Sequence, residues 1–292
     1  MADMEWIADV SVGNWLRERL SEDWSIHHFV PHDFEACARV FHAPSVRSAA
    51  DAADAVGEAT TWAAAAAAFG TTLHAQASWQ HLVKTPTEGS WHTRVAPDGR
   101  KFSAPSEGNL DDATLNQLAT HLLAHTTTPD DGFAAVWEGW GGLVGDARTG
   151  PSQNSLTYSE DAVHQQMLQQ SIYSPLDKLF QRRTWHPGIL SDEISKGPRL
   201  ELPDRDHVLF SAAPSMFTQS EWRNSAPWDD EPLSLLWPAD HAWVVVTEID
   251  YDSTIVAGSN ELIRAICTDS SLEALPLREG ASLHWDADDI NR

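Results

Sequence analysis

The stretch WVVVTEIDYDSTIVAGSNELIRAI, residues 243–266, carries the pattern that decides the fold. A run of β-branched residues leads into an acidic turn, and a second apolar run follows that turn. Apolar residues then recur at helical spacing, directly after Ser259. The stretch therefore predicts two strands joined by a turn at residues 250–252, and then a helix with Ser259 as its N-cap.

The same stretch does not predict a phosphate-binding loop. Such a loop needs a glycine-rich backbone and a lysine that meets the phosphate charge. Gly258 stands alone here, no lysine follows it, and Glu248, Asp250 and Asp252 would repel a phosphate. These acids also lack the regular spacing of a calcium loop. We therefore interpret the stretch as structural.

Outward from this stretch, the two halves of the chain have different patterns. Residues 34–41, 62–69 and 109–125 match helical spacing. From residue 133 on, short apolar runs separated by turn residues predict strands. We expect an α+β fold in which a helical N-terminal part packs on a mostly antiparallel sheet formed by the C-terminal half.

We expect one α+β unit over residues 1–292. Residues 1–130 are predicted to be rich in helix, and residues 131–292 to mix strands and helices. A polar amphipathic helix is predicted over residues 159–171. No internal repeat interrupts this organisation.

Composition and charge exclude several classes of protein. Lys and Arg number 19 against 43 Asp and Glu, so the formal net charge is −24. A field of this sign repels nucleic acid and anionic membrane surfaces. No apolar run reaches the roughly 18 residues that a membrane span requires, and no signal peptide is visible at the start. We expect a cytoplasmic protein in which Cys37 and Cys267, both in apolar helical patterns, are small buried hydrophobes.

Several segments resemble a widespread uncharacterised family of actinobacterial proteins, and they occur in the same order along most of the chain. The matching segments are AAAFGTTLHAQASWQHLV (66–83), HLLAHTTTPDDGFAAVWEGWGG (121–142), LPDRDHVLF (202–210), LLWPADHAWVVVTEIDYDSTIVAGSNELI (235–263), LEALPL (272–277) and WDADDIN (285–291). The resemblance implies an actinobacterial origin. It implies no activity, fold or catalytic residue.

Tryptophan is unusually frequent, with 14 in 292 residues. Indole rings bury a large area and keep one N–H donor, so they are common at binding surfaces. Several of these tryptophans lie in turn-rich or acidic contexts, and the strand end at LPDRDH is expected to bring polar side chains towards them. The predicted binding residues are Trp137, Glu138, Trp140, Asp204, Arg205, His207 and Trp237.

The first functional hypothesis is a non-enzymatic binding protein that uses this tryptophan-rich surface. Its acidic balance suits a cationic protein partner, in the manner of a toxin-neutralising immunity protein. This hypothesis requires no cofactor. It leaves the oligomeric state open.

The second hypothesis is a hydrolase in which His207 or His125 works with a nearby acid as a general acid–base pair. The chain has no Gly-x-Ser-x-Gly motif, and neither cysteine has basic neighbours that would activate it. Covalent catalysis is therefore not predicted from a motif.

The third hypothesis is a metal-binding protein, and it is suggested by the large number of histidines, 14 in all. His121 and His125 share a helical face, but the glutamate of the zinc-peptidase motif is missing beside them. His27, His28 and His32 precede a predicted helix, where caps and solvated turn residues are common. No metal ligand is predicted.

Overall fold

The computed structural model describes residues 4–48, 56–86, 89–148, 184–228 and 231–292. Its main feature is a nine-stranded sheet. The strands are β1 (Glu5–Trp6), β2 (Ala36–Phe41), β7 (Gly132–Trp137), β10 (Leu200–Leu202), β11 (Arg205–Ser211), β12 (Leu235–Pro238), β13 (Val244–Val246), β14 (Ser253–Gly258) and β15 (Ala274–Leu277). The order is β1-β11-β7-β12-β13-β14-β2-β15, with β10 also paired to β11. Every pair is antiparallel.

Strand alternation gives this sheet two buried faces. One row of paired residues crosses five strands on the first face: Ala134, Leu236, Val245, Val256 and Ala38. All five belong to one hydrophobic core. Because successive side chains point to opposite faces, the residues beside this row line a second core on the other face.

Helices cover the first face of the sheet. They are α4 (Asp112–Leu123), α8 (Asn260–Thr268) and the 3-10 turns η4 (Pro214–Thr218) and η5 (Trp222–Ser225). The Trp243 indole N–H donates to the Leu122 carbonyl at 2.9 Å, which ties α4 to the sheet. A large buried ring therefore fills the first core and still has a partner for its polar group.

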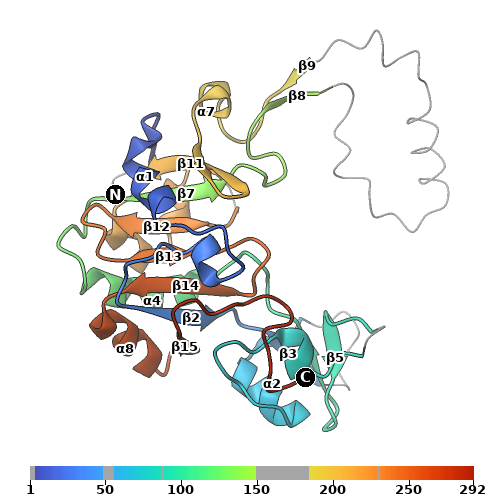
Figure 1. Ribbon diagram of the computed structural model, residues 1–292. Helices are drawn as coiled ribbons and strands as arrows, with labels where there is room; N and C mark the ends of the chain where they lie inside the picture. Colours follow the sequence, from blue (N-terminus) through green and yellow to red (C-terminus); the bar gives the residue numbers. More distant parts are fainter. Residues whose placement is uncertain (1–3, 49–55, 87–88, 149–183, 229–230) are drawn as a thin grey trace.

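The N-terminal segment covers the second face and crosses in front of the sheet in Figure 1. It contains η1 (Val10–Gly13), α1 (Asn14–Glu18) and η2 (Ile26–His28). Leu16, Ile26 and Val30 are buried in the second core. These elements are short, so packing against the sheet, and not helix propensity, stabilises them.

A four-stranded sheet with two helices forms a smaller third core beside β2 and β15 (Figure 1). Its elements are β3 (Ser45–Ser48), β4 (Glu58–Ala59), β5 (Thr93–Val95), β6 (Arg100–Ser103), α2 (Trp62–Phe69) and α3 (Trp79–Leu82). The strand order is β4-β3-β6-β5. The Glu273 carboxylate accepts the backbone N–H groups of Trp62 and Ala63 at the start of α2. This cap joins the smaller sheet to the large one.

A two-stranded ribbon lies between β7 and β10 in the chain. It pairs β8 (Asp146–Arg148) with β9 (Thr184–His186), and α7 (Asp192–Lys196) follows. The amphipathic helix predicted over residues 159–171 lies outside the described residues.

The helical prediction for residues 34–41 is wrong, because residues 36–41 form β2, an interior strand between β14 and β15. Both faces of β2 are buried, so apolar residues occur at nearly every position. Such a continuous run also satisfies helical spacing, and periodicity alone does not separate the two states. Cys37 accordingly lies on a strand, whereas Cys267 lies on α8 as predicted.

The expected division into a helical N-terminal part and a C-terminal sheet is also wrong. Residues 1–130, expected to be rich in helix, supply β1 and β2 to the large sheet and all four strands of the smaller one. Its helices are few and short within the described residues. The protein is a sheet-rich α and β mixture in which strands from both halves interleave.

Residues 243–266 fold as their pattern predicts. They form β13 and β14, and α8 begins after Ser259, whose hydroxyl accepts the Leu262 N–H. Within the described residues, no helix is long and apolar enough to cross a membrane.

Candidate functional site

The candidate site lies where β7 and β11 meet a turn that follows β13. The strand register places His207 directly opposite Trp137. Arg205 lies two residues from His207, so its side chain points to the same face of the sheet. The backbone N–H of Glu138 donates to the Asp206 carbonyl at 2.9 Å and keeps the two strands together at this end.

Two tryptophans meet edge to face at the start of the loop after β7. The Trp137 and Trp140 ring centres are 5.5 Å apart, with 77° between the planes. Both rings are partly exposed. The Trp137 ring lies against Gly139, where a Cβ atom would collide with it. The glycine in this loop is therefore required for close packing of the ring.

Arg205 holds this aromatic pair from the β11 side. Its guanidinium carbon is 5.6 Å from the centre of the Trp137 ring, within the range of a cation–π contact. The same guanidinium donates to Glu248 at 2.9 Å and to Asp250 at 2.8 Å. Two carboxylates from the turn between β13 and β14 thus fix the position of Arg205.

The turn after β13 is acidic and partly buried. Burial, the largest effect, raises the pKa of the Glu248 carboxyl, while Arg205 lowers it and nearby Asp250 raises it further. Burial also raises the pKa of Glu107, with smaller contributions from the charges of Asp252 and Asp250. Several carboxylates therefore concentrate at this corner of the molecule.

A second ion pair braces the loop that carries the tryptophans. Arg199 donates to the Glu138 carboxylate at 2.7 Å. Its other N–H groups donate to the carbonyls of Ile194, Ser195 and Gly197 at the end of α7. The segment containing α7 is thereby attached to the end of β7.

Asp204 connects this region to the N-terminal segment. Its carboxylate accepts a hydrogen bond from His28 Nε2 at 2.9 Å. The Asp204 backbone is in the left-handed region, with φ of 59° at the turn between β10 and β11. Asp and Asn tolerate this conformation better than most residues.

His207 is buried, and this burial lowers its pKa to about 4. Its Nδ1 atom has no hydrogen-bond partner among the described residues. His125 lies elsewhere, with Nδ1 bonded to the His121 carbonyl at 2.8 Å, and His121 Nε2 pairs with Asp269 at 2.7 Å. The two histidines predicted for acid–base chemistry are thus in separate places.

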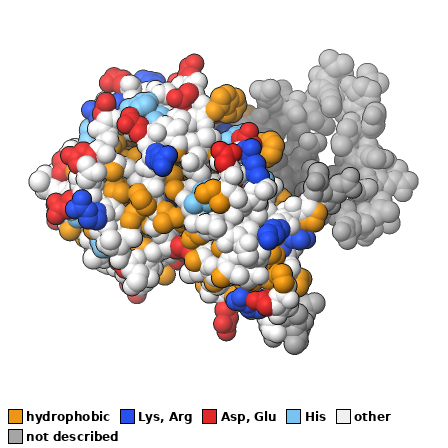
Figure 2. Space-filling view, turned by 60° about the horizontal axis from the view of Figure 1, so that its bottom comes forward, with side chains coloured by type: hydrophobic (Ala, Val, Ile, Leu, Met, Phe, Trp, Pro, Cys, Tyr) orange, Lys and Arg blue, Asp and Glu red, His pale blue; other side chains and the backbone are white. Residues whose placement is uncertain are grey.

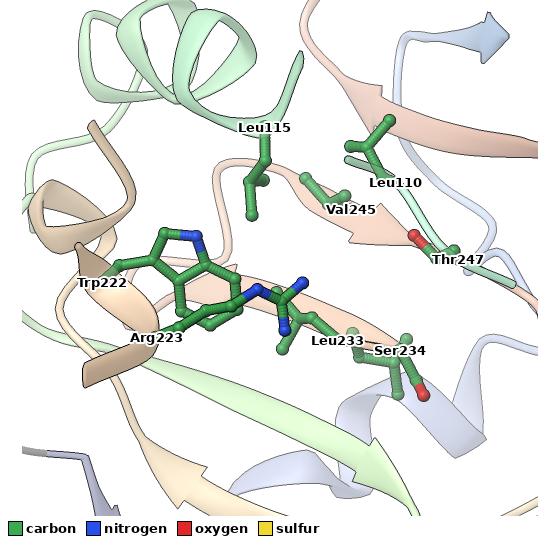
Figure 3. Close-up of a pocket in the computed structure, with 9 residues that line it drawn as sticks. Leu110, Leu115, Trp222, Arg223, Leu233, Ser234, Val245 and Thr247 are labelled. Atoms are coloured by element: carbon green, nitrogen blue, oxygen red, sulfur yellow. The ribbon is translucent and has the colours of Figure 1, made fainter. Parts of the chain in front are cut away.

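One small pocket lies at the candidate site, and another lies towards the first face of the sheet. The first has a cavity volume of about 20 Å³ and is lined by Leu20, His28, Phe29, Leu202, Pro203, Arg205, His207, Ser234, Leu235, Val246, Thr247 and Glu248. The second, shown in Figure 3, has a volume of about 10 Å³ and lies between η5, the start of α4 and the strands β12 and β13. Each has room for little more than one water molecule.

Trp237 is separate from the other six predicted residues. It pairs with Phe133 at the opposite end of β7 and is fully buried, stacked on the Phe133 ring and edge to face with Trp15. Its indole fills the second core. It is therefore not part of the exposed site.

Known proteins give no further guidance. No family model, no curated protein and no solved structure matches this chain. The resemblance to an actinobacterial family remains a prediction.

Sequence reasoning missed three of the groups that build this site: Arg199, Glu248 and Asp250. The acids of the 248–252 turn are evident from the sequence, but no local pattern indicates that Arg205 pairs with Glu248, 43 residues away. The available clue was the position of Arg205, directly after the turn at Pro203-Asp204 and at the start of a predicted strand. His28 was visible only as one of several clustered histidines.

Proposed function

We propose that the protein is a non-enzymatic binding protein whose contact surface contains Trp137, Trp140 and Arg205. The supporting observation is the braced aromatic pair, in which Arg205 is held against Trp137 by two carboxylates. Trp and Arg are the residue types most enriched among energetically dominant contacts at protein interfaces. Their neighbours Glu138, Arg199 and Asp204 complete the surface.

Rigidity is the second argument for a binding role. A side chain that is already fixed loses less conformational entropy when a partner binds. Glu248 and Asp250 fix the guanidinium of Arg205, and Arg199 holds the loop through Glu138. This surface has the pre-organised anchors that a specific contact needs.

The charge supports a cationic protein partner, as for an immunity-type protein that neutralises a basic toxin. The net charge is −24, and in Figure 2 acidic side chains lie along much of the margin of one face, with apolar side chains between them. Complementary charge accelerates association and disfavours partners of the same sign. The two unpaired cysteines accord with a cytoplasmic location.

The geometry gives a hydrolase less support. His207 has a pKa of about 4, far below neutral pH, and a general base works best when its pKa is near the working pH. Its ring has no hydrogen bond to a carboxylate among the described residues, and the pocket beside it is small. Binding of a partner at the surface requires neither a histidine with a pKa near neutral nor a deep pocket.

Affinity capture from a lysate of the native host, followed by mass spectrometry, tests the proposal. Full-length wild type is the bait, and we expect one cationic protein to be enriched. Trp140→Ala should abolish its capture and lower the melting temperature only in part, since the ring packs against the first core but is partly exposed. Trp24→Ala is the matched control, because Trp24 is 86% exposed and lies outside this surface.

A charge reversal gives an independent arm of the test. The Asp250 side chain is 76% exposed, so Asp250→Lys should leave the core intact, while the new cation repels both Arg205 and a cationic partner and capture is lost. Asp289→Lys is its control, since the Asp289 side chain is 86% exposed in the C-terminal segment. Capture that survives both Trp140→Ala and Asp250→Lys contradicts the proposed surface.

A further inference from the structure

Two histidines and a glutamate converge where the N-terminal segment meets the C-terminal segment. Potential ligand atoms of His27, His32 and Glu279 all lie within 4.8 Å of one another. His27 is in η2, His32 follows it, and Glu279 lies just after β15. Residues from the two ends of the chain therefore build one cluster.

His27 presents a buried ring nitrogen that lacks a partner. His27 is only 4% exposed to solvent. Its Nδ1 lies 3.1 Å from the Val30 carbonyl, which can only accept, so Nδ1 carries the proton. The lone pair of neutral His27 is then on Nε2, and Nε2 has no hydrogen-bond partner among the described residues. A buried acceptor without a partner destabilises the fold unless a ligand meets it.

This arrangement of His27 is the one found in metal sites. A histidine that binds a metal through one nitrogen almost always donates its other N–H to a carbonyl or carboxylate. The Val30 carbonyl performs that role here, and it orients the ring. The Val30 N–H in turn donates to the Ile26 carbonyl at 2.8 Å, so the orienting group is itself fixed.

His32 lies directly beside His27. The two imidazole rings are stacked, with centres 3.8 Å apart and 18° between their planes. The Ser21 hydroxyl is within hydrogen-bond distance of His32 Nε2, and the His32 backbone N–H donates to the Arg19 carbonyl. A ring nitrogen binds a metal in the plane of its ring, so His32, the less buried of the two, would have to turn out of this stack to face an ion together with His27.

Glu279 is positioned by backbone pairing between the two segments. The Ile26 N–H donates to the Ala281 carbonyl at 2.8 Å, next to the cluster. Gly280 has φ of 67°, a left-handed conformation that lets the chain turn directly after Glu279. The carboxylate is exposed and so can reach an ion without a large desolvation cost.

We propose that His27, His32 and Glu279 form a zinc-binding site. Two imidazole nitrogens and one carboxylate are a ligand set that suits Zn²⁺, whereas Mg²⁺ and Ca²⁺ prefer oxygen ligands alone. A water molecule takes the fourth position.

Zinc at this position would join the N-terminal segment to the C-terminal segment over the second face of the sheet. An ion that binds the folded chain and not the unfolded chain raises the melting temperature. The site therefore has a readout that requires no activity and no partner.

The test titrates Zn²⁺ into full-length protein from which metal has been removed, in competition with a chromophoric zinc chelator. We expect one equivalent to bind and the melting temperature to rise. Glu279→Gln and His32→Gln should each weaken zinc binding by about tenfold or more, and should reduce the thermal shift. His27 is left intact because it is buried, and Glu279→Gln changes an exposed residue that tolerates the substitution.

His284→Gln is the matched control, because His284 also lies 2.9 Å from a carboxylate, Asp286, but on the exposed surface. It should leave zinc binding unchanged. The proposal is overturned if wild type takes up no zinc, if neither Glu279→Gln nor His32→Gln weakens binding, or if His284→Gln weakens it as much. Uptake of another divalent ion without zinc overturns the assignment to zinc.

Discussion

The guanidinium of Arg205 lies 5.6 Å from the centre of the Trp137 ring while it donates to Glu248 and Asp250. One side chain thus connects an aromatic ring on β7 with an acidic turn beyond β13. The Glu248 side chain is 17% exposed, so its charge depends on this single arginine for compensation.

Arg205→Met keeps the length of the side chain and removes its charge. We expect a loss of about 1–3 kcal/mol in the free energy of unfolding at neutral pH, because Glu248 is left buried without its partner. Burial already raises the pKa of Glu248, and removal of Arg205 raises it further. Protonation at lower pH then removes the uncompensated charge, so the loss should be smaller at pH 5 than at pH 7.

Urea denaturation at the two pH values measures this effect. Arg17→Met is the control, since Arg17 is exposed and its side chain donates to Asn14 Oδ1 at the surface. An equal loss at pH 5 and pH 7 would show that Glu248 does not depend on Arg205.

Arg39 is a buried cation in an otherwise apolar row on the second face of the sheet, between Ile255 and Leu275. It donates to Ser253, Asp252 and the carbonyls of Ala75 and Ala77. We expect Arg39→Lys to cost about 3 kcal/mol or more, because one ammonium does not replace these donors and the groups left behind lose their partner.

Chemical denaturation of Arg39→Lys checks this expectation. Arg264→Lys, on the exposed side of α8, is the matched control and should change the free energy of unfolding by less than about 0.5 kcal/mol. If the two variants are equally stable, the Arg39 bonds do not hold the segment at residues 75–77 to the sheet.

Asp288 is fully buried in the C-terminal segment. Burial alone would raise its pKa, but hydrogen bonds from Asn291, Ser78 and His74 outweigh burial and lower the pKa to about 2. The folded-state pKa is below the ordinary value, so its contribution is present above about pH 4 and is lost as the pH falls through 2. Asp288→Asn should therefore cost about 2 kcal/mol at pH 7 and much less near pH 2.

Free energies of unfolding measured at pH 7 and near pH 2 test whether Asp288→Asn costs more at the higher pH. Asp289→Asn is the adjacent control, with an exposed carboxylate 3.5 Å from Arg292, and should have little effect at either pH. A cost for Asp288→Asn that is independent of pH would contradict the hydrogen-bonded carboxylate.

Gly108 combines a left-handed backbone with a close neighbour. Its φ is 65°, and a Cβ atom would lie 2.7 Å from the backbone of Ile249. Gly99 has φ of 86° but no atom within 4 Å of the same position. Gly99→Ala should cost about 1–2 kcal/mol from backbone strain, and Gly108→Ala clearly more, because backbone atoms must also move. Melting temperatures of the two variants measure the difference, and equal values would contradict the contact with Ile249.

The sequence predicts correctly those helices and turns whose conformation is decided by residues close together in the chain. The hairpin and helix of residues 243–266 follow from a β-branched run, an acidic turn and the cap at Ser259. The helix α4 likewise begins at the cap that Asp111 provides. In each case the determining atoms lie within a few residues of one another.

Long-range pairing was not predictable in the same way. The strand β2 is apolar on both faces, and only its neighbours β14 and β15 select a strand over a helix. The same limit applies to the candidate site, since Trp137 and Arg205 meet through strand register. Trp237 shows the converse, because a tryptophan in a turn-rich context proved to be part of the core.

The position of β2 has a consequence for synthesis on the ribosome. Arg39 in this interior strand contacts Ser253, which is 214 residues later in the chain. At about 5–20 residues per second, the strand waits roughly ten to forty seconds before its partners emerge. During that interval an apolar strand has both edges free, and unpaired edges invite aggregation. We expect the nascent chain, more than the finished protein, to depend on chaperones.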